Sequence, residues 1–177
     1  MSYQLADALA KECGFSHWGP LDPATIVLLP EVRDMCKANK CGAYDTSWAC
    51  PPALGTLDEC RERIKPYSQG ILLQTTALLE DEFDGEAMQK AYEDNNERTL
   101  AFLKQFKAKV PEAMVFGGGA CKKCARCSYP NAPCRFPELF TPSLEAYGIV
   151  VSDICKANSL PYYYGPLTLT YTAAALF

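Results

Sequence analysis

The chain has 177 residues, of which 49% are hydrophobic and 21% charged, so it can bury a core and is not a disordered segment. Its formal net charge of −4 argues against binding to nucleic acid or an anionic membrane, because both attract basic surfaces. The first residues do not resemble a secretory signal, and no apolar run reaches the roughly 20 residues that cross a bilayer. We therefore expect a cytoplasmic protein that forms one α+β domain over residues 1–177.

Local patterns predict the regular elements of the first half of the chain. Apolar side chains recur at four-residue spacing over residues 2–13, which predicts a helix that ends at a glycine. The next segment contains several prolines and is predicted to be a loop, with a short segment at 31–37 leading into a cysteine-rich stretch. Thr56 and Glu59 have the spacing of a capping box, so a short helix is expected to begin there.

The second half is predicted to alternate between strands and helices. Residues 70–79 are rich in Ile, Leu and Thr and predict a strand, and a long helix is predicted over 85–109. The inward positions expected on that helix are Ala91, Leu100, Leu103 and Phe106. Further strands are expected at 113–116, 160–164 and 167–177, with partly helical segments at 141–147 and 151–158. Together these elements predict a small mixed sheet with flanking helices and cysteine-rich metal-binding loops at one edge, 36–52 and 117–137.

The chain has ten cysteines and a single histidine, His17. Cytosolic thiols stay reduced, so metal binding or redox chemistry explains the cysteines better than disulfides do. One imidazole is too few for most zinc-hydrolase sites and does not favour Ser–His or Cys–His nucleophile pairs. We expect His17 to be structural and any chemistry to depend on sulfur.

The densest cysteine segment follows three consecutive glycines and has the spacing C-x2-C-x2-C-x6-C. Three thiolates at two-residue intervals can bind three corners of a four-iron cubane, and a fourth can close it, as in bacterial ferredoxin-type loops. The last gap is longer here, six residues rather than three. The segment predicts a 4Fe-4S cluster or, as the alternative, a structural zinc site with the same four ligands. Those ligands are Cys121, Cys124, Cys127 and Cys134, and the cations expected to offset their negative charge are Lys122, Lys123, Arg126 and Arg135.

Three further cysteines, Cys36, Cys41 and Cys50, lie within fifteen residues of a loop that contains Gly and Pro. Three ligands from one loop predict a second metal site. Either a fourth ligand comes from elsewhere in the chain, or one coordination position is open to a substrate or water. Cys60 and Cys155 are predicted to be core residues, although either could complete this second site.

Four segments resemble a known family: GFSHWGPLDPATIVLLPEVRDMC, the C-x4-C-x8-C-P-P loop, GGGACKKCARCSYPNAPCRFP and TPSLEAYGIVV. Over most of its length the chain resembles the DUF2284 family of small, cysteine-rich predicted metal-binding proteins. The resemblance implies an iron–sulfur protein of largely anaerobic prokaryotes, and it implies no particular reaction. The family's cysteine positions correspond here to Cys36, Cys41, Cys50, Cys121, Cys124, Cys127 and Cys134.

Three functions are compatible with these cysteines. The first is an iron–sulfur protein whose one or two four-iron clusters exchange single electrons with a redox partner protein. The second is an enzyme whose Cys36, Cys41 and Cys50 cluster has an open iron that acts on a small substrate. The third is an interaction module stabilised by structural zinc.

Overall fold

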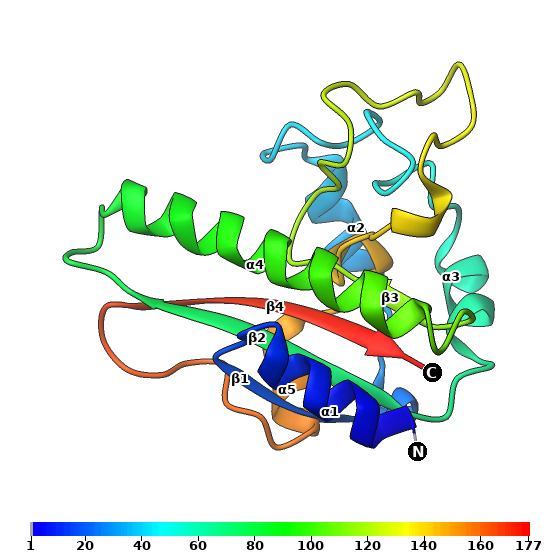
Figure 1. The fold of residues 1–177 in the computed structure, drawn as a ribbon. Helices are drawn as coiled ribbons and strands as arrows, with labels where there is room; N and C mark the ends of the chain where they lie inside the picture. The colour runs from blue at the N-terminus through cyan, green and yellow to red at the C-terminus, as the bar shows by residue number, and fades with distance from the viewer. Residues whose placement is uncertain (1) are drawn as a thin grey trace.

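A four-stranded sheet forms the centre of the computed structural model, which describes residues 2–177. In spatial order its strands are β1 (His17–Leu21), β2 (Gly70–Leu78), β4 (Thr168–Leu176) and β3 (Met114–Phe116). All three neighbouring pairs are antiparallel, and an isolated parallel bridge joins Gly117 to Ser143 just beyond β3. The predicted α+β class is confirmed (Figure 1), and the mixed character of the sheet is limited to that bridge.

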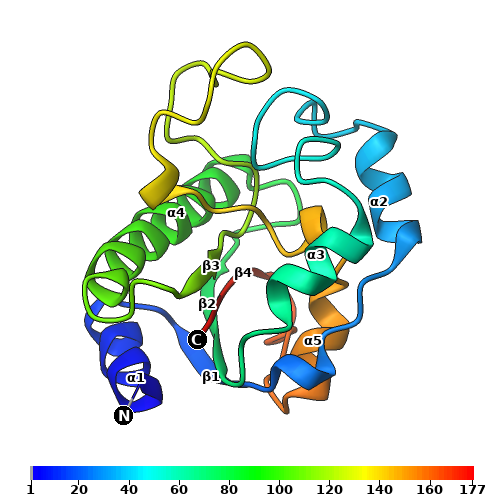
Figure 2. The ribbon, with the colours of Figure 1, turned by 90° about the vertical axis from the view of Figure 1, so that its right-hand side faces the viewer.

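Helices cover both faces of this sheet. Within residues 2–177 the α-helices are α1 (Ser2–Glu12), α2 (Pro30–Lys37), α3 (Leu57–Ile64), α4 (Gly85–Lys107) and α5 (Val151–Ala157). Three single-turn 3-10 helices accompany them: η1 (Pro23–Thr25), η2 (Pro137–Leu139) and η3 (Glu145–Tyr147). Helices α1 and α4 lie on one face, whereas α3 and α5 lie on the other (Figure 2).

Each face of the sheet has its own apolar core. Ile71 and Leu73 of β2 pack with α1 and α4, whereas Leu72 packs with α3, α5 and η3 on the opposite face. Successive side chains of a strand point to opposite faces, so a strand covered on both sides must be apolar at nearly every position. This explains why the alternation of polar and apolar residues is absent from β2.

Most predicted elements are confirmed, including the Thr56–Glu59 capping box at the start of α3. Strand β1 lies in the segment predicted to be a loop. It is an edge strand, and an edge tolerates Pro20, whose nitrogen cannot donate to a neighbouring strand. Residues 160–164 are predicted to form a strand but are irregular. Tyr164 turns its side chain to the sheet, where it donates to Gln74 of β2 and stacks on His17 of β1, instead of pairing through its backbone.

One inward position of α4 differs from the prediction. Leu100 is only partly buried, whereas Phe102 is fully buried against Phe15 and Phe106. The face of α4 that packs on the sheet is therefore rotated slightly from the predicted face. It also includes two buried polar residues, Asn95 and Thr99.

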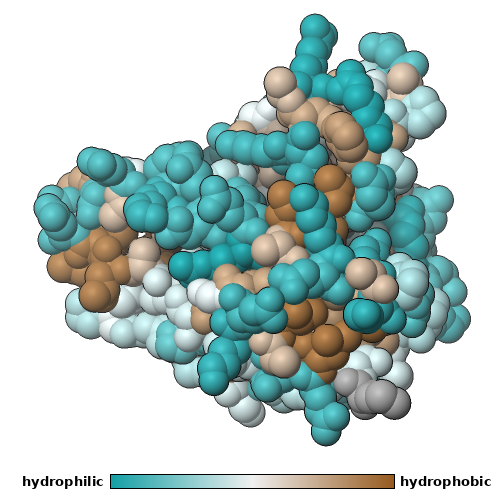
Figure 3. Space-filling model, viewed as in Figure 1, coloured by the Kyte–Doolittle hydropathy of each residue, from teal (hydrophilic) through white to brown (hydrophobic). Residues whose placement is uncertain are grey.

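The far end of the molecule carries exposed apolar side chains. Leu78 ends β2 and Phe83 lies just before α4, and they are 79% and 90% exposed. Figure 3 shows a brown patch at the left of the view, over the region where Figure 1 draws the connection from β2 to α4. No helix among residues 2–177 is both long enough and apolar enough to cross a membrane.

Candidate metal centre

The two cysteine-rich segments lie beside each other beyond the β3 edge of the sheet. One leaves the C-terminus of α2 and the other leaves β3, and both views show them adjacent (Figures 1 and 2). Cys36 occupies the last turn of α2, whereas the cysteines of the second segment lie in irregular chain. Segments separated by about eighty positions in the sequence thus meet, because α2 packs on η3 and the chain that leaves β3 pairs with Ser143 just before η3.

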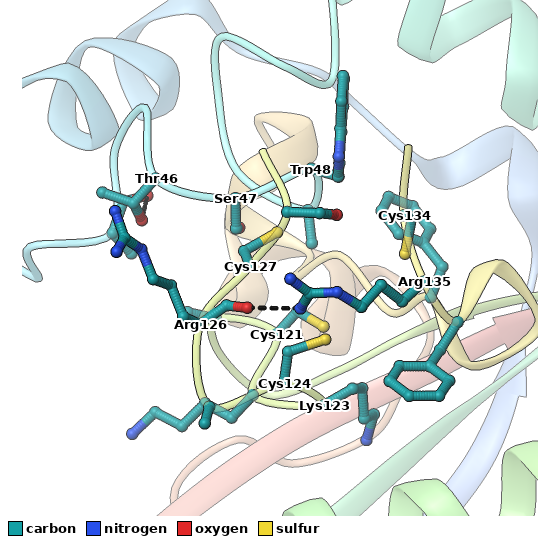
Figure 4. Close-up of a pocket in the computed structure, with 18 residues that line it drawn as sticks. Thr46, Ser47, Trp48, Cys121, Lys123, Cys124, Arg126, Cys127, Cys134 and Arg135 are labelled. Atoms are coloured by element: carbon teal, nitrogen blue, oxygen red, sulfur yellow. Dashed lines mark hydrogen bonds between the residues drawn. The ribbon is translucent and has the colours of Figure 1, made fainter. Parts of the chain in front are cut away.

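Cys121, Cys124, Cys127 and Cys134 line one cavity of about 580 Å³. All four are partly exposed free thiols. Figure 4 shows Cys121, Cys124 and Cys127 grouped together, with Cys134 across the cavity from them. The structure therefore places the four sequence-predicted ligands of the first site around one cavity.

The same cavity is lined by the four cations that the sequence suggested, Lys122, Lys123, Arg126 and Arg135. None of the residues described as lining it is acidic. Arg135 Nη1 donates to the carbonyl oxygen of Arg126 at 2.7 Å, which draws its side chain back toward the cysteines (Figure 4). Lys122 Nζ lies 4.9 Å from the centre of the Tyr92 ring, a cation–π distance. The walls are thus suited to a group of negative charge.

Cys36, Cys41 and Cys50 line a second, smaller cavity of about 270 Å³. Burial raises the pKa of the Cys36 thiol, and negative charge on Cys41 raises it further, whereas Arg33 lowers it. The three cysteines differ in exposure: Cys50 is buried, Cys36 is partly buried and Cys41 is exposed. The predicted trio therefore lines one cavity.

The two cavities adjoin each other. Ala43 and Ala120 line both of them. Burial raises the pKa of Cys50, and it is raised further by Cys41 of its own site and by Cys121 and Cys127 of the other. Cys50 is thus close enough to both sets of thiols for negative charge on either set to raise its pKa.

Aromatic residues fasten one cysteine segment to the other. The Trp48 indole donates to the carbonyl oxygen of Ala132 at 3.0 Å, and its ring meets Tyr129 edge-on with centroids 4.9 Å apart. The Tyr129 hydroxyl donates to Asp45 Oδ1 at 2.6 Å. These contacts fix the relative position of the two segments, which is the role of residues that support a metal site from outside.

The glycines before Cys121 allow a close approach to α4. A Cβ atom on Gly118 would lie 2.4 Å from Asn95 Nδ2, and one on Gly119 would lie 2.9 Å from the Tyr92 ring. Real Cβ atoms do not approach other atoms so closely, so a larger residue at either position would require the Asn95 or the Tyr92 side chain to shift. The cysteine segment is therefore seated directly on α4.

The remaining cysteines lie away from both cavities. Cys60 and Cys155 are 0% exposed in the core around α3 and α5, as predicted, and neither lines the trio's cavity. Cys13 packs at the edge of the α1–α4 core. His17 stacks on Tyr164 with ring centroids 3.9 Å apart, which agrees with its expected structural role.

A family comparison bears on what these cavities hold. The model of the DUF2284 family, described as predicted metal-binding proteins, matches residues 19–177. The chain belongs to the DUF2284 family. No curated protein and no solved structure matches it.

The donor atoms of this DUF2284 protein fit the metal binding for which its family is named. Thiolates are soft ligands that bind zinc, copper(I) or iron–sulfur clusters, so a site built from these seven cysteines would favour a metal of that group. Among residues 2–177, no three His, Cys, Asp or Glu side chains converge closely enough to hold a single ion. The cysteines stand around the walls of two cavities instead of around two points.

The structure adds residues to this DUF2284 site that the sequence did not assign. The backbone oxygen of Ser47 accepts a hydrogen bond from the Cys50 backbone nitrogen at 3.2 Å, and Ser47 lines the first cavity. Tyr129 joins Trp48 in bracing the two segments. Glu145 lines the trio's cavity from η3, about a hundred positions away in sequence. Its segment was singled out only as part of the family pattern, because no local spacing connects it to a cysteine.

Proposed function

We propose that this metal-binding protein is an iron–sulfur protein of anaerobic metabolism that acts in electron transfer or related redox chemistry. One observation carries the proposal: four cysteines spaced C-x2-C-x2-C-x6-C line one cavity together with four cations and no described acid. Oxidised four-iron clusters with four thiolate ligands carry net negative charge, which such walls favour. Cys121, Cys124, Cys127 and Cys134 would hold a 4Fe-4S cluster.

A cluster in this cavity would supply one-electron transfer. The protein's own residues hold the thiolates in place, offset their charge and keep the two segments together through Trp48 and Tyr129. The partial exposure of the four cysteines leaves the site near the surface, where a redox partner protein can approach.

The trio favours a second candidate function. Its cavity is lined by only three cysteines among the described residues, so a metal group there would have one position that is not a thiolate. A position of this kind can accept a small substrate, and the protein would then be an enzyme. The two functions are compatible, because the cavities adjoin each other and Cys50 lies between them.

Metal analysis tests the proposal. The protein is purified without oxygen, and iron, inorganic sulfide and zinc are counted per chain alongside the visible absorption spectrum. We expect iron and sulfide in equal amounts and a broad visible absorbance that dithionite bleaches. A colourless protein with stoichiometric zinc would reject the proposal and leave the zinc-stabilised interaction module.

A matched pair of cysteine variants locates the cluster. Cys124→Ala is expected to lose the iron of one site and keep the fold, because Cys124 is a partly exposed cavity residue. Cys60→Ala is expected to keep the iron and lose about 1 kcal/mol of unfolding free energy, since it empties a small volume in the core. Equal iron contents in wild type and Cys124→Ala would contradict the assignment of the first site.

A further inference from the structure

The cavity of the cysteine trio contains one acidic residue among the described residues that line it. Glu145 lines it together with Cys36, Cys41 and Cys50. The same residue lines an adjoining hollow of about 480 Å³, which it shares with Cys36 and Cys41. Among the described residues no other acid lines both, so Glu145 is the acidic residue that borders the trio.

The position of Glu145 is fixed by contacts between η3 and α2. The backbone nitrogen of Leu29, just before α2, donates to the carbonyl oxygen of Gly148 at 2.8 Å. Gly148 has φ of 85°, and a Cβ there would meet the oxygen of Leu29 at 3.0 Å, so a side chain would push the two segments apart. At the other end of α2, Cys36 Sγ lies 3.9 Å from the backbone oxygen of Glu145. The segment that carries the carboxylate is thus fastened beside the first cysteine of the trio.

Other candidates for a fourth ligand are weaker. Cys60 and Cys155 are buried elsewhere in the core and do not line this cavity. The Ser143 hydroxyl lines it but already accepts a hydrogen bond from the backbone nitrogen of Ala146 at 3.1 Å. Tyr44 also lines the cavity, yet a phenol must lose a proton before it binds a metal, whereas a carboxylate at neutral pH need not.

We propose that Glu145 is the fourth protein ligand of the metal group held by Cys36, Cys41 and Cys50. The inference rests on the proposed function for the identity of the metal. It assigns Glu145 to the coordination position that the three cysteines do not occupy. An oxygen ligand donates less electron density than a thiolate and makes the metal it binds chemically distinct from the other three. That metal is the one at which a small substrate could displace a protein ligand.

The experiment compares variants of Glu145 in the full chain, loaded with iron-57 and sulfide without oxygen. Mössbauer spectra and iron counts are recorded for wild type, Glu145→Gln, Glu145→Ala and Glu145→Cys. Wild type is expected to show a minor iron component distinct from the sulfur-coordinated irons. Glu145→Gln and Glu145→Ala should lose that component together with about one iron per chain, whereas Glu145→Cys should keep the iron and convert the component to sulfur coordination.

Two further variants serve as controls. Glu31→Gln removes an acid that lines only the adjoining hollow and should leave the spectrum as in wild type. Tyr44→Phe removes the rival ligand and should also have no effect. Circular dichroism of each variant before loading shows that the fold is retained.

The outcomes distinguish a failure of the proposed function from a failure of the Glu145 assignment. A wild-type protein without iron would reject the proposed function. An iron-loaded protein whose spectrum is the same in wild type and in all three Glu145 variants would overturn the Glu145 assignment alone. Loss of the minor component in Tyr44→Phe, with Glu145→Gln unchanged, would likewise overturn it and assign the position to the phenol.

Discussion

At the scale of single residues, Glu59 closes the N-terminus of α3. Its carboxylate accepts a hydrogen bond from the Thr56 backbone nitrogen at 2.7 Å, while the Thr56 hydroxyl accepts from the Glu59 backbone nitrogen at 3.2 Å. The bond from the Thr56 backbone, helped by the Thr56 side chain, holds the pKa of Glu59 below its usual value. A carboxylate with a lowered pKa in the folded state stabilises that state above its unfolded pKa, and the contribution is lost as pH falls through the folded pKa.

Glu59→Gln should therefore weaken the pH dependence of stability on the acid side. The amide can still occupy the cap but carries no charge that protonation removes, so the variant is less stable than wild type at neutral pH and approaches it below about pH 4. Urea unfolding at neutral and acid pH measures the effect. Glu62→Gln on the same helix, which pairs with Lys65 in solvent, is the control, and parallel curves for Glu59→Gln and wild type would contradict the prediction.

At the scale of elements, the segment that leaves β3 packs directly against helix α4, and Gly118 lies at the contact. Asn95 of α4 is 0% exposed and neither polar atom of its side chain has a hydrogen-bond partner among the described residues. Its nitrogen is the atom that a Cβ on Gly118 would meet. The cysteine segment can change position only if α4 or this side chain moves with it.

Gly118→Ala is accordingly expected to destabilise the fold by about 1–3 kcal/mol, as overpacking of a close contact does. Gly85→Ala is the matched control, because Gly85 begins α4 with nothing within 4 Å of an added Cβ. That change should be neutral or stabilising by less than about 1 kcal/mol. Thermal unfolding of both variants gives the comparison, and equal melting temperatures would be evidence against the contact.

The elements found from sequence are those with local signals. The Thr56–Glu59 box, the apolar β2 and the long α4 are encoded by neighbouring residues, so pattern and spacing are sufficient. Strand β1 was missed because its place at the edge, which makes Pro20 acceptable, is a property of the assembled sheet.

The candidate site likewise contains residues that local spacing predicts and residues that it does not. Both groups of cysteines were predicted from their spacing, whereas Glu145 and Tyr129 meet them only through long-range packing that no local pattern records. The identity of the metal stays a prediction, because the same thiols suit iron–sulfur clusters and zinc.

At the scale of the whole molecule, strand β4 connects β2 to β3 and contributes residues to both apolar cores. It pairs with both β2 and β3, and its residues Ala173 to Leu176 are all 0% exposed between the two cores. No residue of β4 lines either cysteine cavity. Both sites nevertheless depend on it, since β3 has no other partner in the sheet.

Ala174→Asp should therefore abolish metal binding at both sites from a distance. A buried, unpaired charge costs about 3–5 kcal/mol, which is comparable to the total stability of many domains. Circular dichroism and metal content are expected to fall together. Leu167→Asp, at a 42% exposed position just before the strand, should retain both, and an Ala174→Asp protein that keeps its metal would show that the sites do not need the sheet.

The central place of β4 also dictates an order of events during biosynthesis. On the ribosome both cysteine segments emerge before β4 is made, and until then β3 has nothing to pair with. The nascent chain therefore exposes its reduced thiols on unanchored polypeptide. The cavities that gather these thiols depend on the sheet, so we expect them to form, and any metal held by them to be loaded, only after β4 has been synthesised.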